Sequence, residues 1–474
     1  MNASNFCFTG GWGKDDAWLR SFDHKNMTRL PLLRPGLPED AIAWRGNRPI
    51  TRRDFRRDLA ALSARLPDRP YVLNHCDDRY HFLVGLAAAC TRGQVSLFPS
   101  NRVPEVLAQL KRDYPGMYCL SDQAAPEELA LMEVCAYDTR AAMQEAADPM
   151  FAPEQLVAVA FTSGSTGVPK RYPKHWGGFV HEARIAGQRL GLNAAAAGQV
   201  LATVPPQHMY GFVYSVIMPA QFGYAVGAER PFYPEDIRRA LAARPQPTIL
   251  VTTPVHIRAC VLDGVRFPPL DFILSSTAAL DAALAAQAES LYGAPLHEFY
   301  GSTETGAIAS RRQAHSALWR TFDDIRVAST DDGFRVETPY LPEPLVLGDQ
   351  VEVRNEREFL LHGRNTEIVK IAGKRVALGD LNRLLLAVEG VVDATFFLPN
   401  IEAGAREPRL TAFVVAPGRT REQILDALRS HIDPVFLPRP LRLVEALPRN
   451  ATGKLPRANL LQLLRETEAK EMTR

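Results

Sequence analysis

The chain has 474 residues with a formal net charge of +2, and 46% of its residues are hydrophobic and 23% are charged. This is an ordinary globular composition for roughly two to four domains, and the small net charge gives no support to a nucleic-acid partner. The six cysteines lack C-x-x-C spacing, which argues against a disulfide framework and a zinc site. The first residues contain no basic segment followed by an apolar core, and the longest apolar run, residues 82–90, is too short for a membrane span. We therefore expect a cytoplasmic protein.

Short apolar runs alternate with helical patterns between residues 156 and 300, which predicts βαβ units and a largely parallel sheet. Helices are expected where Phe179, Ala183, Ala186 and Leu190 recur at helical spacing, and over residues 281–292. The expected strands are 156–161, 200–204, 248–253, 271–276 and 296–300. Several of these strands lead directly into hydroxyl- or glycine-rich segments. Ligands of open α/β sheets bind beyond the carboxyl ends of the strands, so these segments predict one composite site.

The pattern changes after about residue 345. Residues 345–364 read as paired strands around a turn, and the following residues as a strand, a turn and a helix within a small α+β unit. Residues 364–474 carry 18 Lys plus Arg against 13 Asp plus Glu, a net charge of +5. We therefore expect a large N-terminal α/β domain with largely parallel sheets, residues 1–363, and a small basic α+β domain, residues 364–474.

The stretch FTSGSTGVPK, residues 161–170, has the glycines and hydroxyls of a phosphate-binding loop. It does not match the P-loop of kinase-type proteins, because Pro169 takes the place of the second glycine and Arg171 follows Lys170 where Ser or Thr is required. Taken alone, the stretch is equally compatible with a polar surface turn.

Four separated segments together resemble the adenylate-forming enzymes, a family that includes acyl- and aryl-CoA synthetases, carrier-protein ligases and luciferases. FTSGSTGVPK is similar to the family's phosphate loop and YGSTETG (300–306) to its acidic motif. LGDQV with LHGR (347–351 and 361–364) is similar to the ribose-binding and hinge region, and LPRNATGKLPR (447–457) to the C-terminal lysine loop. The order and spacing also resemble those of the family. The resemblance implies attack of a carboxylate on the α-phosphorus of ATP, release of pyrophosphate, and transfer of the acyl group to a thiol.

The resemblance also implies a role for each matched residue. Glu304 would ligate Mg²⁺, Thr303 would contact the α-phosphate, and Lys454 would stabilise the adenylation transition state. His208, also among the catalytic candidates, falls where relatives place an aromatic gate between the carboxylate and ATP sites. Without the resemblance, the acidic motif could be a helix N-cap followed by a first-turn carboxylate. The residues implied to bind ATP or AMP are Thr162, Ser163, Gly164, Ser165, Thr166, Gly167, Lys170, Ser276, Thr277, Phe299, Tyr300, Gly301, Ser302, Asp349 and Arg364.

The acid is expected to bind among Tyr210, Gly211, Tyr214, Ser275 and Gly306, although such an aromatic stripe is more often core packing. Residues 201–228 contain no Asp or Glu to pair an ammonium group, which disfavours an amino acid and favours an aryl or acyl acid. A fainter resemblance to ligases of bacterial pigment pathways suggests a hydroxybenzoate-type acid. The alternative is a fatty or other acyl-CoA synthetase.

The acceptor thiol stays open between CoA and the phosphopantetheine arm of an acyl carrier protein, since both are anionic and the C-terminal domain is basic. The resemblance implies that this domain is mobile and rotates between the two half-reactions, with Thr366 at the hinge where relatives carry an acidic residue or a lysine. A monomer or homodimer is expected. A non-catalytic nucleotide-binding protein remains the alternative of another class, although the presence of Glu304, Asp349, Arg364 and Lys454 together weighs against it.

Overall fold

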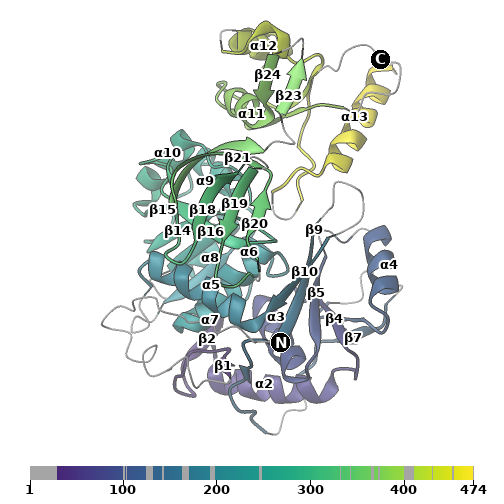
Figure 1. The fold of residues 1–474 in the computed structure, drawn as a ribbon, viewed down its shortest axis with the longest axis vertical. Coiled ribbons are helices and arrows are strands. Elements are labelled where there is room, and N and C mark those ends of the chain that lie inside the picture. Colours follow the sequence, from purple (N-terminus) through teal and green to yellow (C-terminus); the bar gives the residue numbers. More distant parts are fainter. Residues whose placement is uncertain are drawn as a thin grey trace. The chain divides into compact units, whose positions relative to one another are not determined.

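The computed structural model describes residues 29–99, 102, 104–123, 132–140, 144–162, 170–192, 198–244, 248–330, 333–341, 343–364, 368–371, 374–399, 410–429, 431–450 and 453–472. The chain divides into two compact units (Figure 1). The first unit contains residues 1–326 and 337–344, and the second contains residues 327–336 and 345–474. This division assigns residues 345–363 to the second unit, earlier than the expected boundary. The expected boundary at residues 363–364 marks where the C-terminal domain would rotate relative to the rest of the chain, and it stays a prediction.

The first unit contains two large sheets. One is six-stranded, with parallel pairs inside and the antiparallel strand β10 at its edge. Its order is β10 (Lys170–His175), β9 (Leu156–Thr162), β5 (Val95–Phe98), β4 (Tyr71–Asn74), β6 (Tyr118–Ser121) and β7 (Val134–Ala136). Strand β9 was expected to belong with the strands up to residue 300, yet it pairs with β5 and β10. Each expected strand is present, but the sequence pattern did not separate the two sheets.

In the second sheet, β12, β11, β13, β14 and β15 are parallel neighbours, as expected for βαβ units. The strands of the first unit follow the order β17 (Trp319–Thr321), β16 (Gly306–Arg311), β15 (Leu296–Ser302), β14 (Phe272–Ser275), β13 (Thr248–Thr252), β11 (Gln199–Ala202), β12 (Ala225–Gly227), β2 (Ala41–Arg45) and β3 (Arg48–Thr51). The short strands β1 (Leu30–Pro31) and β8 (Met150–Phe151) form a separate antiparallel pair.

Helices cover both faces of the second sheet. Apolar side chains of α8 (Pro234–Ala242), α9 (Pro254–Leu262) and α10 (Ala282–Tyr292) pack on one face in a common core. Helix α10 begins where expected, because the Asp281 carboxylate accepts the free N–H groups of Ala283 and Leu284. On the outer face of the six-stranded sheet lies α4 (Pro104–Asp113).

Helices also lie between the two sheets. Helix α3 (Arg79–Thr91) contacts β4 and β5 of one sheet and β12 of the other, and it packs on α2 (Arg52–Arg65). Helix α5 (Trp176–Arg189) contacts β10 and the segment formed by α6 (Met209–Phe212), the π-helical turn η2 (Val213–Ile217) and α7 (Met218–Phe222). Phe82, Phe98, Phe179 and Phe212 meet here, with successive ring centroids 4.9–6.3 Å apart. The segment predicted to bind the acid is therefore held against α5 by aromatic packing.

The second unit is built from small strand pairs and two three-stranded sheets, β18–β19–β20 and the mixed sheet β25–β26–β27, as the α+β pattern predicted. Its strands are β18 (Arg326–Thr330), β19 (Gly333–Glu337), β20 (Leu345–Leu347), β21 (Asp349–Asn355), β22 (Glu358–Arg364), β23 (Ile368–Ile371), β24 (Lys374–Ala377), β25 (Asp393–Phe397), β26 (Thr411–Val415) and β27 (Leu441–Leu443). Its helices are α11 (Leu378–Leu386), α12 (Arg421–Arg429), the 3₁₀ turn η4 (Pro434–Phe436) and α13 (Arg457–Met472). Helices α11 and α12 bury apolar faces against the sheet of β25, β26 and β27.

In the described part of the chain, no helix combines the length and the apolar character that crossing a bilayer requires.

Candidate active site

The acidic motif forms a tight turn, residues 302–307, between the antiparallel strands β15 and β16. A helix N-cap, the other reading of this motif, is not what the structure shows. Ser302 N donates to the Thr305 hydroxyl (3.1 Å), Thr305 N donates to the Ser302 hydroxyl (3.2 Å), and the Thr305 hydroxyl donates to the Gly306 carbonyl (2.8 Å). Thr305 is fully buried, whereas Thr303 and Glu304 are half-buried. The buried hydroxyl therefore fixes the turn that carries Glu304.

Two glycines permit the close approach of the strands in this turn. A side chain on Gly301 would place Cβ 2.1 Å from the Gly306 carbonyl oxygen. Gly306 itself has φ +68°, in the left-handed region that glycine tolerates best. The pattern YGSTETG thus has a structural requirement for both glycines, independent of any ligand. Of the residues predicted to bind nucleotide here, Phe299 is buried and packs on Tyr214 with ring centroids 5.0 Å apart, and Tyr300 packs on Trp319.

Only the two ends of the predicted phosphate loop can be described. Thr162 ends β9 and Lys170 begins β10, and the two are register partners in the antiparallel pair. Ser163, Gly164, Ser165, Thr166 and Gly167 lie outside the described residues. Arg171 forms an exposed ion pair with Asp113 (2.8 Å), so it is occupied away from the loop.

Strand β10 directs further side chains toward the acidic turn. Residues 170, 172 and 174 share one face of the strand, because side chains alternate along it. The Lys174 ammonium group donates to the backbone carbonyl of Glu304 (2.9 Å). Burial, and then the negative charge of Glu304, raise the pKa of Tyr172. Neither residue was among the predicted site residues. The alternation of positions 170, 172 and 174 could have indicated that they share a face with Lys170.

Helix α5 contributes a carboxylate that the sequence did not single out. Glu182 is only 6% exposed, and its Oε1 accepts hydrogen bonds from the Tyr214 hydroxyl (2.8 Å) and from Ala307 N (2.9 Å). Burial raises the pKa of Glu182, and the two hydrogen bonds and the charge of Lys174 oppose that rise. Burial likewise lowers the pKa of Lys174. Residues 201–228 do lack an acid, but the fold brings one to Tyr214 from another helix.

The predicted acid-binding segment begins at His208, which caps α6. Its Nδ1 accepts from Tyr210 N (3.3 Å), and the side chain is half-buried. The Tyr210 hydroxyl donates to the carbonyls of Thr252 (3.1 Å) and Leu274 (2.8 Å), so this buried ring links the carboxyl ends of β13 and β14. Gly211 leaves room for the Pro205 carbonyl, which a Cβ would approach to 2.1 Å. The chain then passes into the π-helical turn that carries Tyr214, a conformation frequent at functional sites.

The segment after β14 is strained. Thr277 has φ +80°, an uncommon conformation for a β-branched residue, which costs on the order of 1–3 kcal/mol. Beside it, the Ser276 hydroxyl donates to the Phe299 carbonyl (2.9 Å), which ties this segment to β15. Ser275 is fully buried. Such strain is concentrated at ligand-binding sites, and this supports the expected nucleotide contact at 276–277.

The remaining predicted residues lie in the second unit. Asp349 and Arg364 are register partners at the open end of the β21–β22 hairpin, and the side chain of Arg364 is outside the described part. Lys454 is exposed in a turn in which its N–H donates to Asn450 Oδ1 (2.9 Å) and its carbonyl accepts from Asn450 N (2.8 Å). The hinge residue Thr366 is not described.

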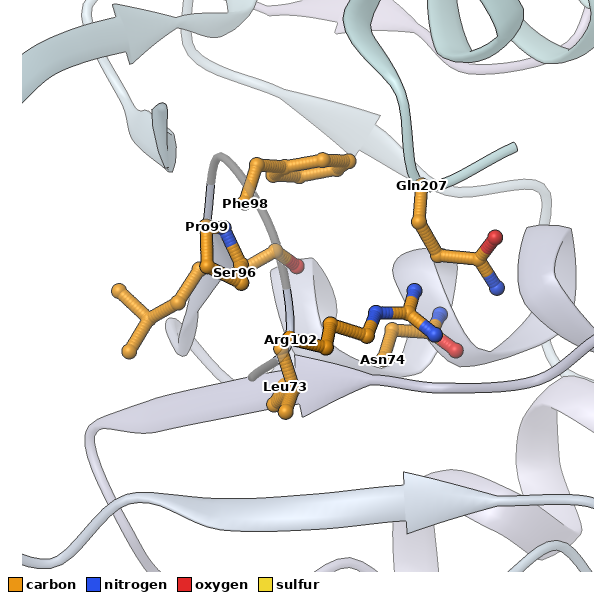
Figure 2. A pocket seen from close by; sticks show the side chains of 8 residues that line it. Leu73, Asn74, Ser96, Phe98, Pro99, Arg102 and Gln207 are labelled. Atoms are coloured by element: carbon orange, nitrogen blue, oxygen red, sulfur yellow. The ribbon is translucent and has the colours of Figure 1, made fainter. Parts of the chain in front are cut away.

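A small cavity of about 10 Å³ lies in the first unit beside β4 and β5. Figure 2 shows Arg102, Asn74 and Gln207 around it, with Phe98 and Pro99 above the arginine. This volume holds about one water molecule and is far below the 300 Å³ or more typical of small-molecule sites. The cavity therefore does not account for binding of the acid.

Comparison with known proteins bears on the family and the fold. The family model "AMP-binding enzyme" matches residues 62–332. A 4-coumarate–CoA ligase of Halorhodospira halophila is 32% identical over 307 residues, 62% of this chain and 73% of the relative. A 3-hydroxybenzoate–CoA/4-hydroxybenzoate–CoA ligase of Thauera aromatica is 24% identical over 360 residues, 67% of this chain and 68% of the relative.

Solved structures share the fold at lower sequence identity. The anthranilate CoA ligase AuaEII with anthranoyl-AMP has a TM-score of 0.76 at 17% identity, covering 92% of this chain and 98% of that one. The o-succinylbenzoate CoA synthetase of Bacillus subtilis with its acyl-adenylate has a TM-score of 0.77 at 17% identity and the same coverage. The same synthetase has been solved with ATP and magnesium. The resemblance seen in four short motifs thus extends over the fold, and the chain belongs to the AMP-binding enzyme family of adenylate-forming acid–thiol ligases.

Proposed function

We propose that this enzyme uses ATP and Mg²⁺ to activate a hydroxylated aryl carboxylic acid and transfers the acyl group to CoA. The observation that carries the proposal is the link, through Phe299 and Glu182, between the aromatic segment 208–214 and the β15–β16 hairpin that bears the acidic turn. Tyr214 packs on Phe299 and donates to Glu182, which in turn accepts from Ala307 N. Tyr210, Phe212 and Tyr214 are buried in this packing. We place the ring of the acid next to this segment and its carboxylate toward the turn that carries Glu304. The aryl-CoA ligases among its relatives support the same substrate class.

The residues present suit a magnesium ion at Glu304. Its carboxylate lies half-buried at the turn, and within the described residues it forms no ion pair, since Lys174 donates to the backbone carbonyl of Glu304 instead. A hard carboxylate oxygen is a ligand that Mg²⁺ prefers. When bound there, the ion would neutralise charge on the phosphates of ATP.

In the first half-reaction, a carboxylate oxygen of the acid forms a bond to the α-phosphorus, and the bond to the departing pyrophosphate breaks. The carboxylate is already a nucleophile, so the chain supplies positioning and charge neutralisation and needs no general base. We assign phosphate binding to the loop 162–170, the α-phosphate to Thr303, and the carboxylate side to His208. Lys454 would stabilise charge on the attacking and α-phosphate oxygens, and Asp349 would accept from the ribose hydroxyls.

In the second half-reaction, the thiol of the acceptor loses its proton to solvent and its sulfur forms a bond to the acyl carbon. The single bond between that carbon and the phosphate oxygen breaks, and AMP leaves with the electron pair. We propose CoA as acceptor because the curated relatives are named CoA ligases. A carrier protein remains the alternative that the experiment must test.

The test is pyrophosphate release with a panel of acids. It should include 4-coumarate, 3- and 4-hydroxybenzoate, unsubstituted benzoate and a medium-chain fatty acid. CoA and a phosphopantetheinylated carrier protein are then offered in parallel to the best acid. We expect acid-dependent release that is highest with a hydroxylated aryl acid, and thioester formation on CoA. Release only with the fatty acid would refute the substrate assignment, and thioester formation only on the carrier protein would refute the acceptor assignment.

A further inference from the structure

Two charged side chains, the half-buried Lys174 and the buried Glu182, form hydrogen bonds to the backbone of the acidic turn and of the strand that follows it. Lys174, on β10, donates its ammonium group to the carbonyl of Glu304 (2.9 Å). Glu182, on α5, accepts from the N–H of Ala307 (2.9 Å). The Glu304 carbonyl lies at the tip of the turn, and the Ala307 N–H lies three residues later, in β16. We infer that Lys174 and Glu182 are positioning residues that fix the direction of the Glu304 carboxylate toward the metal and nucleotide.

Glu182 is itself fixed by its surroundings. The Tyr214 hydroxyl donates to its Oε1, and its Oε2 lies directly over Gly306, where a Cβ would come within 2.4 Å of it. The backbone of Ala307 accepts a further hydrogen bond, in which the Tyr340 hydroxyl donates to the Ala307 carbonyl (3.2 Å). The end of the turn that follows Glu304 therefore has little freedom to shift.

Lys174 forms its hydrogen bond with a backbone carbonyl and not with a carboxylate. Although its charge interacts with both Glu182 and Glu304, no ion pair within 4 Å joins it to either carboxylate in the described structure, and the hydrogen bond goes to a backbone carbonyl. Lys174 thus restrains the Glu304 backbone and does not itself occupy the carboxylate, which forms a side-chain hydrogen bond with Tyr172 on the same face of β10. A buried carboxylate and a half-buried ammonium group are unfavourable choices for packing alone, because apolar side chains of similar volume serve that purpose without desolvating charge.

The inference deepens the proposed function and rests on it for the role of Glu304. Outer residues that orient metal ligands typically change metal affinity or activity by 10–100-fold when they are substituted. We therefore expect Lys174→Met and Glu182→Gln each to raise the Mg²⁺ concentration that gives half-maximal pyrophosphate release by roughly tenfold or more. Lys174→Arg, which keeps a charged donor, should restore part of the loss.

Arg171→Met is the matched control, since Arg171 lies on the same strand, faces the opposite side and pairs with the surface residue Asp113. The second measurement is equilibrium binding of a non-hydrolysable ATP analogue by calorimetry, with Mg²⁺ and with EDTA. Lys174→Met should lose affinity only when Mg²⁺ is present. Arg171→Met should match the unsubstituted enzyme in both buffers.

The inference is overturned if Lys174→Met and Arg171→Met have the same Mg²⁺ dependence, or if Lys174→Met loses analogue affinity equally in both buffers. If Lys174→Met does not fold, Glu182→Gln and Lys174→Arg decide by the same measurements. Failure of the proposed function is distinguishable, because the unsubstituted enzyme would then release no pyrophosphate with any acid. The magnesium-dependent part of analogue binding would still report on Lys174 and Glu182.

Discussion

At the scale of single residues, the site depends on backbone positions as much as on chemical groups. Gly306 takes a positive φ, and the Glu182 carboxylate occupies the space above its Cα. The Thr305 hydroxyl forms its hydrogen bonds within the turn, accepting from Ser302 N and donating to the Gly306 carbonyl. The motif YGSTETG therefore specifies a rigid turn whose tip presents Thr303 and Glu304.

We predict that Gly306→Ala lowers the rate of adenylate formation by about 100-fold, because displacing Glu182 by a fraction of an ångström also moves the turn. Backbone strain should add about 1–2 kcal/mol of destabilisation. Gly293→Ala is the control, since Gly293 has a similar φ of +63° with open space around it. It should show only the loss of stability in urea that backbone strain causes, with unchanged pyrophosphate release. Equal activity of the two variants would contradict the argument.

Lys454→Ala should reduce adenylate formation by about 10²–10³-fold, as loss of a transition-state donor does. Transfer from a supplied acyl-adenylate to CoA should be affected much less, because the assigned role of Lys454 belongs to the first half-reaction. The two steps are measured separately, by pyrophosphate release and by thioester formation. Lys470→Ala removes another exposed lysine of the same unit as a control. The same loss in both steps would speak against the assignment.

At the scale of elements, the hairpin of β15 and β16 is held by a buried ion pair behind the turn. Arg311 Nε lies 2.7 Å from Glu298 Oε2, with side-chain exposures of 9% and 3%, and the Glu298 Oε1 accepts from Leu280 N. The Arg311 guanidinium also lies over the Trp319 ring. Burial raises the pKa of Glu298, and Arg311 opposes that rise.

Arg311→Met should destabilise the protein by about 3–5 kcal/mol at pH 7, because it leaves the Glu298 charge buried without a partner. The loss should shrink as the pH falls from 7 toward 5. Without Arg311 the folded-state pKa of Glu298 rises further above its unfolded value, so the folded variant takes up a proton first and the unpaired charge disappears. Urea unfolding at several pH values measures this. Arg312→Met, which breaks a partly exposed pair with Glu289, should cost less stability than Arg311→Met between pH 7 and 5, because the Arg312 side chain is 41% exposed and its pair is screened by solvent. A pH-independent loss for Arg311→Met would refute the explanation.

At the scale of the whole molecule, we predict that the second unit changes its orientation between the two half-reactions, because the assigned site residues are distributed over both units. The residues assigned to phosphate and acid belong to the first unit, whereas Asp349, Arg364 and Lys454 belong to the second. Thr366 is the predicted hinge, and residues 370–376 would approach the site for transfer.

Thr366→Pro should separate the two half-reactions, because proline fixes φ near −65° and removes the N–H at this position. We expect acid-dependent pyrophosphate release to persist and thioester formation to fall by roughly tenfold or more. Thr366→Ser keeps the backbone free and should retain both activities. Thioester formation at the normal rate in Thr366→Pro would show that the chain does not rotate at this residue.

The sequence determined the fold class, several strands and helices of residues 156–300, and the family, because these follow from local periodicity and from motifs contiguous in the chain. The expected strands and the expected helix that ends at Tyr292 are present, and the order of four motifs indicated the family before the fold was known. The tertiary structure alone decided that β9 and β14 belong to different sheets, since strand pairing depends on contacts far apart in sequence. It also decided that Lys174 and Glu182 meet the turn more than 120 residues away. No local pattern marks such contacts, because hydrogen bonds between distant backbone and side-chain groups form only when the packed helices and sheets bring them together.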